Sequence, residues 1–78
     1  MASGSDDIRK RIEKDIELFN KNVASVKGSD KNVSRILELS QMYAKDSKSY
    51  LDKGDFYTSF SCISYAHGLL DAIRELQG

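Results

Sequence analysis

The chain has 78 residues, of which 40% are hydrophobic and 31% charged, with 12 basic and 12 acidic side chains. A chain of this length forms one small domain, and a net charge of zero argues against a protein that coats nucleic acid by neutralising phosphates. No apolar run approaches the roughly 20 residues needed to cross a bilayer, and a single cysteine cannot form a disulfide within the chain. We therefore expect a protein that does not bind membrane and for which nucleic-acid binding is disfavoured, and nothing in the cysteine content indicates an oxidising compartment.

The first five residues, "MASGS", lack the apolar core of a signal peptide, and we expect them to be a flexible lead-in or a remnant of cloning. Residues 6–78 would then form the single domain. A helix is predicted over residues 6–26, because apolar side chains recur there at spacings of 4, 3, 4 and 3. Asp6 and Asp7 suit the start of this helix, where unpaired amides and the positive end of the helix dipole favour carboxylates. The apolar stripe is narrow, so this helix should cover only one side of the others.

The segment "KGSD", residues 27–30, interrupts the pattern. Gly28 can end the first helix in the left-handed conformation, and Ser29 or Asp30 can cap the next. A second helix is predicted over residues 31–52, with 4-3 spacing again. The middle of its apolar seam is small, since it holds Ser40, Ala44 and Ser47. Small side chains let a neighbouring helix come close.

A second break, "DKGD" at residues 52–55, places Gly54 where a helix ends and Asp55 where the next begins. The third helix, residues 56–77, has an apolar arc of roughly 220° and should be the most buried element. Short connections make neighbouring helices antiparallel. The predicted fold is all-α, an up-down-up antiparallel three-helix bundle. A glycine within a helix costs about 1 kcal/mol relative to alanine, so we expect Gly68 to meet Ser40 and Ala44 at the closest approach of the second and third helices.

His67 and Asp71 lie four residues apart on one helical edge. They could form a general base held by a carboxylate, or two ligands of a metal ion. The interpretation we favour is a structural histidine that is hydrogen-bonded to its helix neighbour. A zinc site needs three or four ligands, and the chain has one histidine and one cysteine, so only a symmetric dimer could complete such a site.

Other reactive side chains carry weaker signals. Cys62 has no indicated partner, and we expect a small buried apolar residue rather than a nucleophile. Arg9, Lys10 and Arg11 form the one basic run, but acidic residues surround it, so a solvated face is favoured over a phosphate contact. There is no glycine-rich phosphate loop, HExxH or CxxC motif. We therefore predict no catalytic residue, metal ligand or cofactor.

One long segment is more specific than these local patterns. Residues 51–76, "LDKGDFYTSFSCISYAHGLLDAIREL", combine "KGD" and an aromatic residue with a run of small residues and then "YAHG-LDA". This segment resembles the C-terminal signature of a family of short archaeal proteins, domain-of-unknown-function family 357. The resemblance implies an archaeal, cytoplasmic, all-helical protein. It implies no activity and no functional residue.

The leading hypothesis is a non-enzymatic interaction module that self-associates, with a dimer favoured, or that binds another protein. It is motivated by the wide apolar arc of residues 56–77, which the narrow stripe of residues 6–26 would leave partly uncovered. The alternative is a ligand- or metal-binding bundle, which could be enzymatic, centred on His67 and Asp71. The predicted self-association surface consists of Tyr65, Leu69, Ala72 and Leu76.

Overall fold

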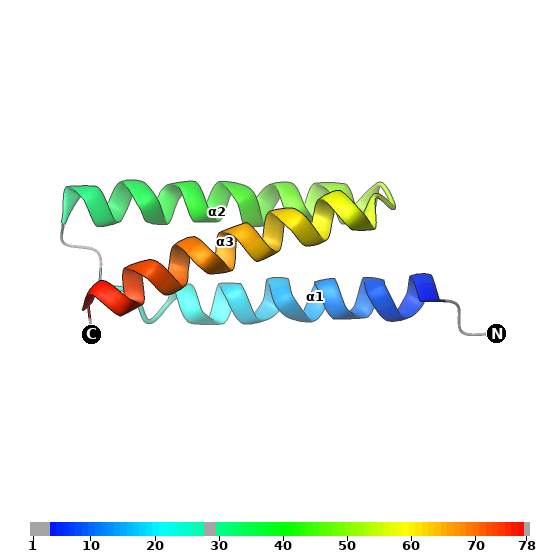
Figure 1. The fold of residues 1–78 in the computed structure, drawn as a ribbon, viewed down its shortest axis with the longest axis horizontal. Coiled ribbons are helices and arrows are strands. Elements are labelled where there is room, and N and C mark those ends of the chain that lie inside the picture. The colour runs from blue at the N-terminus through cyan, green and yellow to red at the C-terminus, as the bar shows by residue number, and fades with distance from the viewer. Residues whose placement is uncertain (1–3, 28–29, 78) are drawn as a thin grey trace.

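The computed structural model describes residues 4–27 and 30–77, and that part of the chain contains three helices and no strand. They are α1 (Gly4–Val23), α2 (Lys31–Asp52) and α3 (Phe56–Gln77). Each helix runs antiparallel to the one before it, so α1 and α3 point the same way, and α3 lies across the other two (Figure 1). The predicted all-α three-helix bundle is confirmed.

The second and third helices have the predicted bounds, whereas the first begins at Gly4 and ends at Val23 rather than spanning residues 6–26. The helix stops early because Ser25 bonds back to Asn22 twice, from its amide over 3.0 Å and from its hydroxyl over 2.7 Å. Val26, although outside the helix, still packs against the core. Residues 1–3 of the expected lead-in, and the turn residues Gly28 and Ser29, lie outside the described residues.

Both helix starts that follow a turn are capped by an aspartate, as predicted. Asp30 accepts from the amide of Asn32 over 2.7 Å at the start of α2, and Asp55 accepts from the amide of Thr58 over 3.1 Å at the start of α3. Gly54, at φ +81°, ends α2 in the left-handed region. The amides of Gly54 and Asp55 donate back to Leu51 and Tyr50, each over 3.0 Å, which is the paired arrangement of a Schellman motif.

The core is built most heavily from α3, the helix predicted to be the most buried. α3 buries five residues, α2 buries four and α1 buries Ile12 and Phe19. Burying one large aliphatic or aromatic side chain contributes about 1.5–3 kcal/mol, so these side chains hold the bundle together. The core residues from α3 are Ser59, Ile63, Ala66, Leu70 and Ile73.

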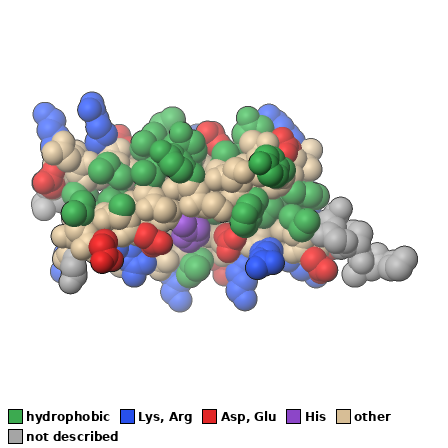
Figure 2. Space-filling model, in the orientation of Figure 1, with side chains coloured by type: hydrophobic (Ala, Val, Ile, Leu, Met, Phe, Trp, Pro, Cys, Tyr) green, Lys and Arg blue, Asp and Glu red, His purple; other side chains and the backbone are tan. Residues whose placement is uncertain are grey.

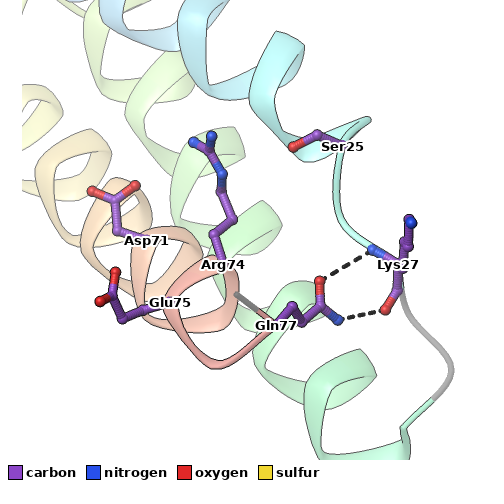
Figure 3. Close-up of a pocket in the computed structure, with 6 residues that line it drawn as sticks. All are labelled: Ser25, Lys27, Asp71, Arg74, Glu75 and Gln77. Atoms are coloured by element: carbon purple, nitrogen blue, oxygen red, sulfur yellow. Dashed lines mark hydrogen bonds between the residues drawn. The ribbon is translucent and has the colours of Figure 1, made fainter.

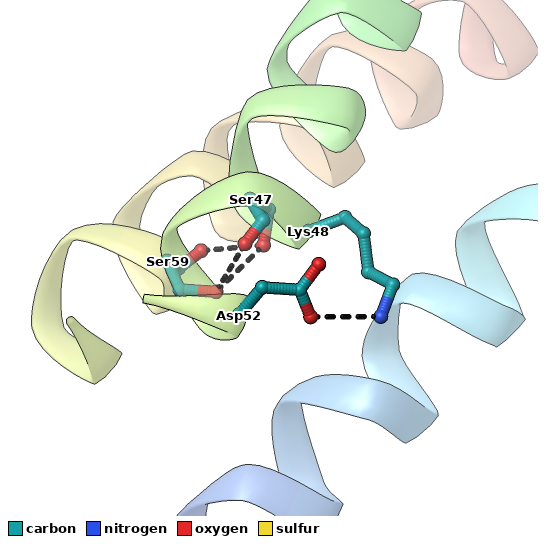
Figure 4. A network of polar contacts seen from close by, with 4 residues as sticks. All are labelled: Ser47, Lys48, Asp52 and Ser59. Atoms are coloured by element: carbon teal, nitrogen blue, oxygen red, sulfur yellow. Dashed lines mark hydrogen bonds and ion pairs between the residues drawn. The ribbon is translucent and has the colours of Figure 1, made fainter. Parts of the chain in front are cut away.

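The closest polar contact between α2 and α3 is a reciprocal pair of serines (Figure 4). The Ser47 hydroxyl donates to the carbonyl oxygen of Ser59, and the Ser59 hydroxyl donates to that of Ser47, each over 2.7 Å. Both residues are fully buried, so the two helix backbones are close together at this level. The exposed pair Lys48–Asp52 beside them, at 3.0 Å, adds little because solvent screens it.

Gly68 does not take part in a close helix contact, so the prediction that it meets Ser40 and Ala44 is wrong. Gly68 is exposed, and a Cβ atom built on it would meet no atom within 4 Å. Ser40 and Ala44 are buried as expected, and the Ser40 hydroxyl donates to the carbonyl of Leu37 over 2.7 Å. Gly68 is exposed because of the rotation of α3 about its own axis. It follows the buried Ile63 by five residues and therefore lies about 140° around the helix from it.

Candidate functional site

His67 joins α3 to α1. Its Nε2 atom lies 2.8 Å from the main-chain carbonyl oxygen of Asp15, and since a carbonyl can only accept, Nε2 carries the proton. The ring also meets Phe19 edge-on, with ring centroids 5.6 Å apart and an interplanar angle of 88°. The imidazole is half-buried and is visible in purple in Figure 2. The sequence indicated a structural histidine, but its bond runs to another helix rather than to Asp71.

Asp71 is exposed and makes no hydrogen bond with His67 in the structure. Both residues border an open hollow of about 470 Å³ between α1 and α3, and acidic, basic and apolar side chains share its walls. Within residues 4–27 and 30–77, no group of three or more His, Cys, Asp or Glu side chains could hold a metal ion. The residues lining the hollow are Arg11, Asp15, Leu18, Phe60, Ser64, His67 and Asp71.

A second hollow, of about 630 Å³, lies at the end of α3 (Figure 3). Gln77 closes one side of it, because its amide accepts from the main-chain N–H of Lys27 over 3.3 Å and donates to the carbonyl of the same residue. Asp71, Glu75 and Arg74 supply charges of both signs along α3. Such a mixture gives no single-sign field that would select a charged ligand. The Gln77 contact instead fastens the last turn of α3 to the segment that follows α1.

One group of exposed apolar side chains lies on α2 and α3, and Figure 2 shows hydrophobic side chains gathered over these helices. Met42 is 61% exposed, Tyr65 52% and Leu76 78%. The rings of Tyr43 and Tyr65 meet edge-on across the two helices, with centroids 4.6 Å apart. We call this group the α2–α3 apolar face, and it consists of Leu39, Met42, Tyr43, Tyr65, Leu69 and Leu76.

The predicted strip on α3 contributes half of this face. Tyr65, Ala72 and Leu76 are exposed, and Leu69 is half-buried. The contribution of α2 was missed in reading the sequence, although Leu39 and Met42 are two apolar residues that lie off the predicted seam of their helix. Their position off the seam was the feature of the sequence from which these two residues could have been predicted to be exposed.

A further apolar hollow, of about 470 Å³, lies between the first halves of α1 and α3. Phe60, an apolar residue of the helix predicted to be the most buried, is 47% exposed here and lies beside Ile8, which is 46% exposed. Arg9 lies over the ring of Phe56, with its guanidinium carbon 5.2 Å from the ring centroid. This residue of the basic run therefore contacts an aromatic ring of α3.

Cys62 is half-buried, whereas full burial was expected. Desolvation raises the pKa of the Cys62 thiol, and the carboxylates of Asp46 and Asp55 raise it further. A raised pKa keeps the thiol protonated at neutral pH. Because the thiolate is the reactive form, Cys62 is a poor nucleophile in the folded protein.

These observations define a class of protein: a small three-helix bundle with apolar side chains exposed on two of its sides. In the described residues, no helix is long and apolar enough to cross a membrane. The chain belongs to the DUF357 family, described as "Protein of unknown function (DUF357)", whose model matches residues 14–78. The predicted resemblance to this family is confirmed, and the match includes all of α2 and α3. No curated protein matches the sequence.

Proposed function

We propose that this protein is a non-enzymatic helical module that binds other protein chains through the α2–α3 apolar face. The observation that carries the proposal is the exposure of Met42, Tyr65 and Leu76, each more than half accessible, on adjoining helices. Scattered apolar residues are normal on a protein surface, but contiguous apolar patches mark interaction sites. The ring contact between Tyr43 and Tyr65 joins the α2 and α3 parts of the α2–α3 apolar face, and on this ground we treat the face as such a patch.

The composition of this face supports a protein partner. Tyrosine and methionine are enriched at the centres of protein interfaces, and charged residues other than arginine are depleted there. The edge-on contact between Tyr43 and Tyr65 restrains both rings before any partner arrives. A restrained ring loses less conformational freedom on binding, which favours affinity.

A ligand- or metal-binding site at His67 and Asp71 is the weaker alternative. The Nε2 atom of His67 is already bonded to Asp15, so that nitrogen is not free to bind a ligand while α1 and α3 stay together. A site there would have to use the other ring nitrogen together with groups from a second chain. If His67→Ala altered the binding of a metal ion or small molecule, this alternative would replace the proposal.

The experiment uses acidic substitutions on the face and one matched control. Met42→Glu and Leu76→Glu place a charge among exposed apolar side chains, and Lys45→Glu changes an exposed residue of α2 outside the face. Biotinylated protein would recover binding partners from cell extract, and sedimentation would measure self-association. We expect both face variants to lose the partner that the parent and Lys45→Glu retain. The proposal fails if Met42→Glu and Leu76→Glu still bind every partner that the parent binds and still self-associate as the parent does.

We also propose that the protein acts in the cytoplasm. The support is the single cysteine, which cannot close a disulfide within the chain and suits a reducing compartment. Fractionation of the source cells, followed by detection with an antibody, would test this location.

A further inference from the structure

Helix α1 carries a four-residue stripe whose chemistry is complementary to itself when the helix is reversed. Ile8, Arg11, Asp15 and Leu18 follow one another at spacings of 3, 4 and 3, so they lie along one side of the helix. In chain order the stripe is apolar, basic, acidic and apolar. Read backwards, it is apolar, acidic, basic and apolar. We call these four residues the α1 stripe.

The α1 stripe is accessible in the single chain. Ile8 is 46% and Leu18 48% exposed, Arg11 is exposed and Asp15 is half-buried. In the described residues the one ion pair is Lys48–Asp52, so Arg11 and Asp15 do not pair with each other within 4.0 Å. Two large apolar side chains and two opposite charges are therefore available to a partner.

The stripe borders a continuous groove. The two hollows between α1 and α3 share Arg11 and Phe60 as lining residues, so they adjoin one another along the helices. Phe60, 47% exposed, adds an aromatic ring to the same wall as Ile8. A helix lying on the α1 stripe would thus also cover part of α3.

We propose that a second copy of this chain binds here, with the two α1 helices packed antiparallel about a two-fold axis. In this register Ile8 of one copy meets Leu18 of the other, and Arg11 meets Asp15, each pair occurring twice. These two pairs, each formed twice, give four contacts along a stripe that is about 15 Å long at 1.5 Å per residue. Phe60 lies at the level of Ile8 and would extend the apolar contact to Leu18 of the second copy.

Charge complementarity is what identifies a second copy as the occupant. A two-fold interface is made from the same patch on both subunits, so the patch must complement itself. In the proposed register, both apolar residues of the α1 stripe meet apolar residues and both charges meet their opposites. The α2–α3 apolar face is defined by apolar residues alone, so it offers no pattern of opposite charges that would identify its partner. The family model matches residues 14–78, so it includes Asp15 and Leu18 of the α1 stripe but not Ile8 or Arg11.

This proposal adds one named partner, a second copy of the chain, to the proposed function. It rests on the proposed function in one respect only, namely that the protein acts by binding other protein chains. It uses a different surface, on α1 rather than α2. Substitutions on the two surfaces therefore report separately on the two proposals.

The test exploits the two opposite charges. Arg11→Glu brings two acidic residues together in the dimer, and Asp15→Arg brings two basic residues together. Sedimentation equilibrium at concentrations up to about 1 mM, a range that detects weak dimers, should show a dimer for the parent. Each single variant should dissociate at least about tenfold more readily, and an equimolar mixture of the two should regain parent affinity, because each supplies the charge that the other needs.

Lys10→Glu and Glu17→Arg are the matched controls, since they make similar charge changes at exposed positions of α1 outside the stripe. They should dimerise like the parent, and circular dichroism should show all variants folded. The proposal is overturned if the parent is monomeric throughout, if the single variants dimerise like the parent, or if their mixture stays monomeric. If only Met42→Glu and Leu76→Glu abolish the dimer, the α1 proposal fails and the proposed function stands.

Discussion

The imidazole of His67 in α3 donates a hydrogen bond to the main-chain carbonyl of Asp15 in α1, over 2.8 Å. A carbonyl oxygen has two lone pairs and can accept a second bond beside the one within its helix. The serine pair of α2 and α3 uses the same device, since each hydroxyl donates to a carbonyl of the other helix. Polar side chains of α2 and α3 thus hydrogen-bond to main-chain carbonyl groups of a neighbouring helix, and these bonds hold α3 against both α1 and α2.

Removing the imidazole should destabilise the fold. His67→Ala deletes the bond to Asp15 and the contact with Phe19, and we expect the free energy of unfolding to fall by about 1–3 kcal/mol. Denaturation by urea, followed by circular dichroism, measures this change. Asp71→Ala is the control, and it should lie within about 0.5 kcal/mol of the parent because Asp71 is exposed. Equal effects of the two substitutions would contradict a structural role confined to His67.

The serine contact should tolerate loss of its hydroxyl better than added bulk. Ser47→Ala removes one buried hydrogen bond at a cost of about 1 kcal/mol. Ser47→Val should cost more than Ser47→Ala, since it also adds methyl groups where the two helices are close, and overpacking costs about 1–3 kcal/mol. Ser49→Val, at an exposed position of α2, controls for the lower helix propensity of valine. A Ser47→Val protein as stable as the parent would show that the two helices are not tightly packed there.

Gly54 and Gly68 should respond to alanine in opposite directions. Gly68 lies within a helix with open space around it, so Gly68→Ala should stabilise the protein by about 0.5–1 kcal/mol. Gly54 has φ +81°, which a side chain disfavours, so Gly54→Ala should cost about 1–2 kcal/mol. Thermal unfolding of both variants measures the two signs. Destabilisation by Gly68→Ala would mean that the glycine meets a neighbour absent from the single chain, such as a partner helix.

The thiol of Cys62 should react slowly in the folded state. Because its pKa is raised, the thiolate is scarcer at about pH 8 than in an unfolded chain, where the thiol pKa is about 8.5. Alkylation by iodoacetamide should therefore accelerate when urea unfolds the protein. A faster reaction in the folded state would contradict the raised pKa.

The same shift predicts how stability depends on pH. The folded state holds the Cys62 proton more tightly than the unfolded state. The bound proton therefore contributes to the free energy of unfolding below the ordinary thiol pKa, and this contribution is lost as pH rises above it. Urea denaturation of the parent and of Cys62→Ser between neutral pH and about pH 10 isolates the effect from other groups. The parent should lose more stability over this range than the variant.

The sequence by itself determined the helices and most of their ends. Apolar spacing of three and four residues, Asp30 and Asp55 as caps and Gly54 as a terminator act between residues close in the chain, so they can be read without a fold. The end of α1 was predicted too late because Val26 keeps the apolar spacing while Ser25 closes a tighter turn. The burial of Ser40 and Ala44 also followed from periodicity.

Only the tertiary structure decided which faces meet. The hydrogen-bond partner of His67 lies 52 residues away along the chain, and Gly68 does not lie at the close helix contact where the sequence analysis placed it. The physical reason is that the rotation of each helix about its own axis reflects all of its contacts with two neighbours at once. A broad apolar arc such as that of α3 permits several rotations, and packing against α1 and α2 selects the one observed.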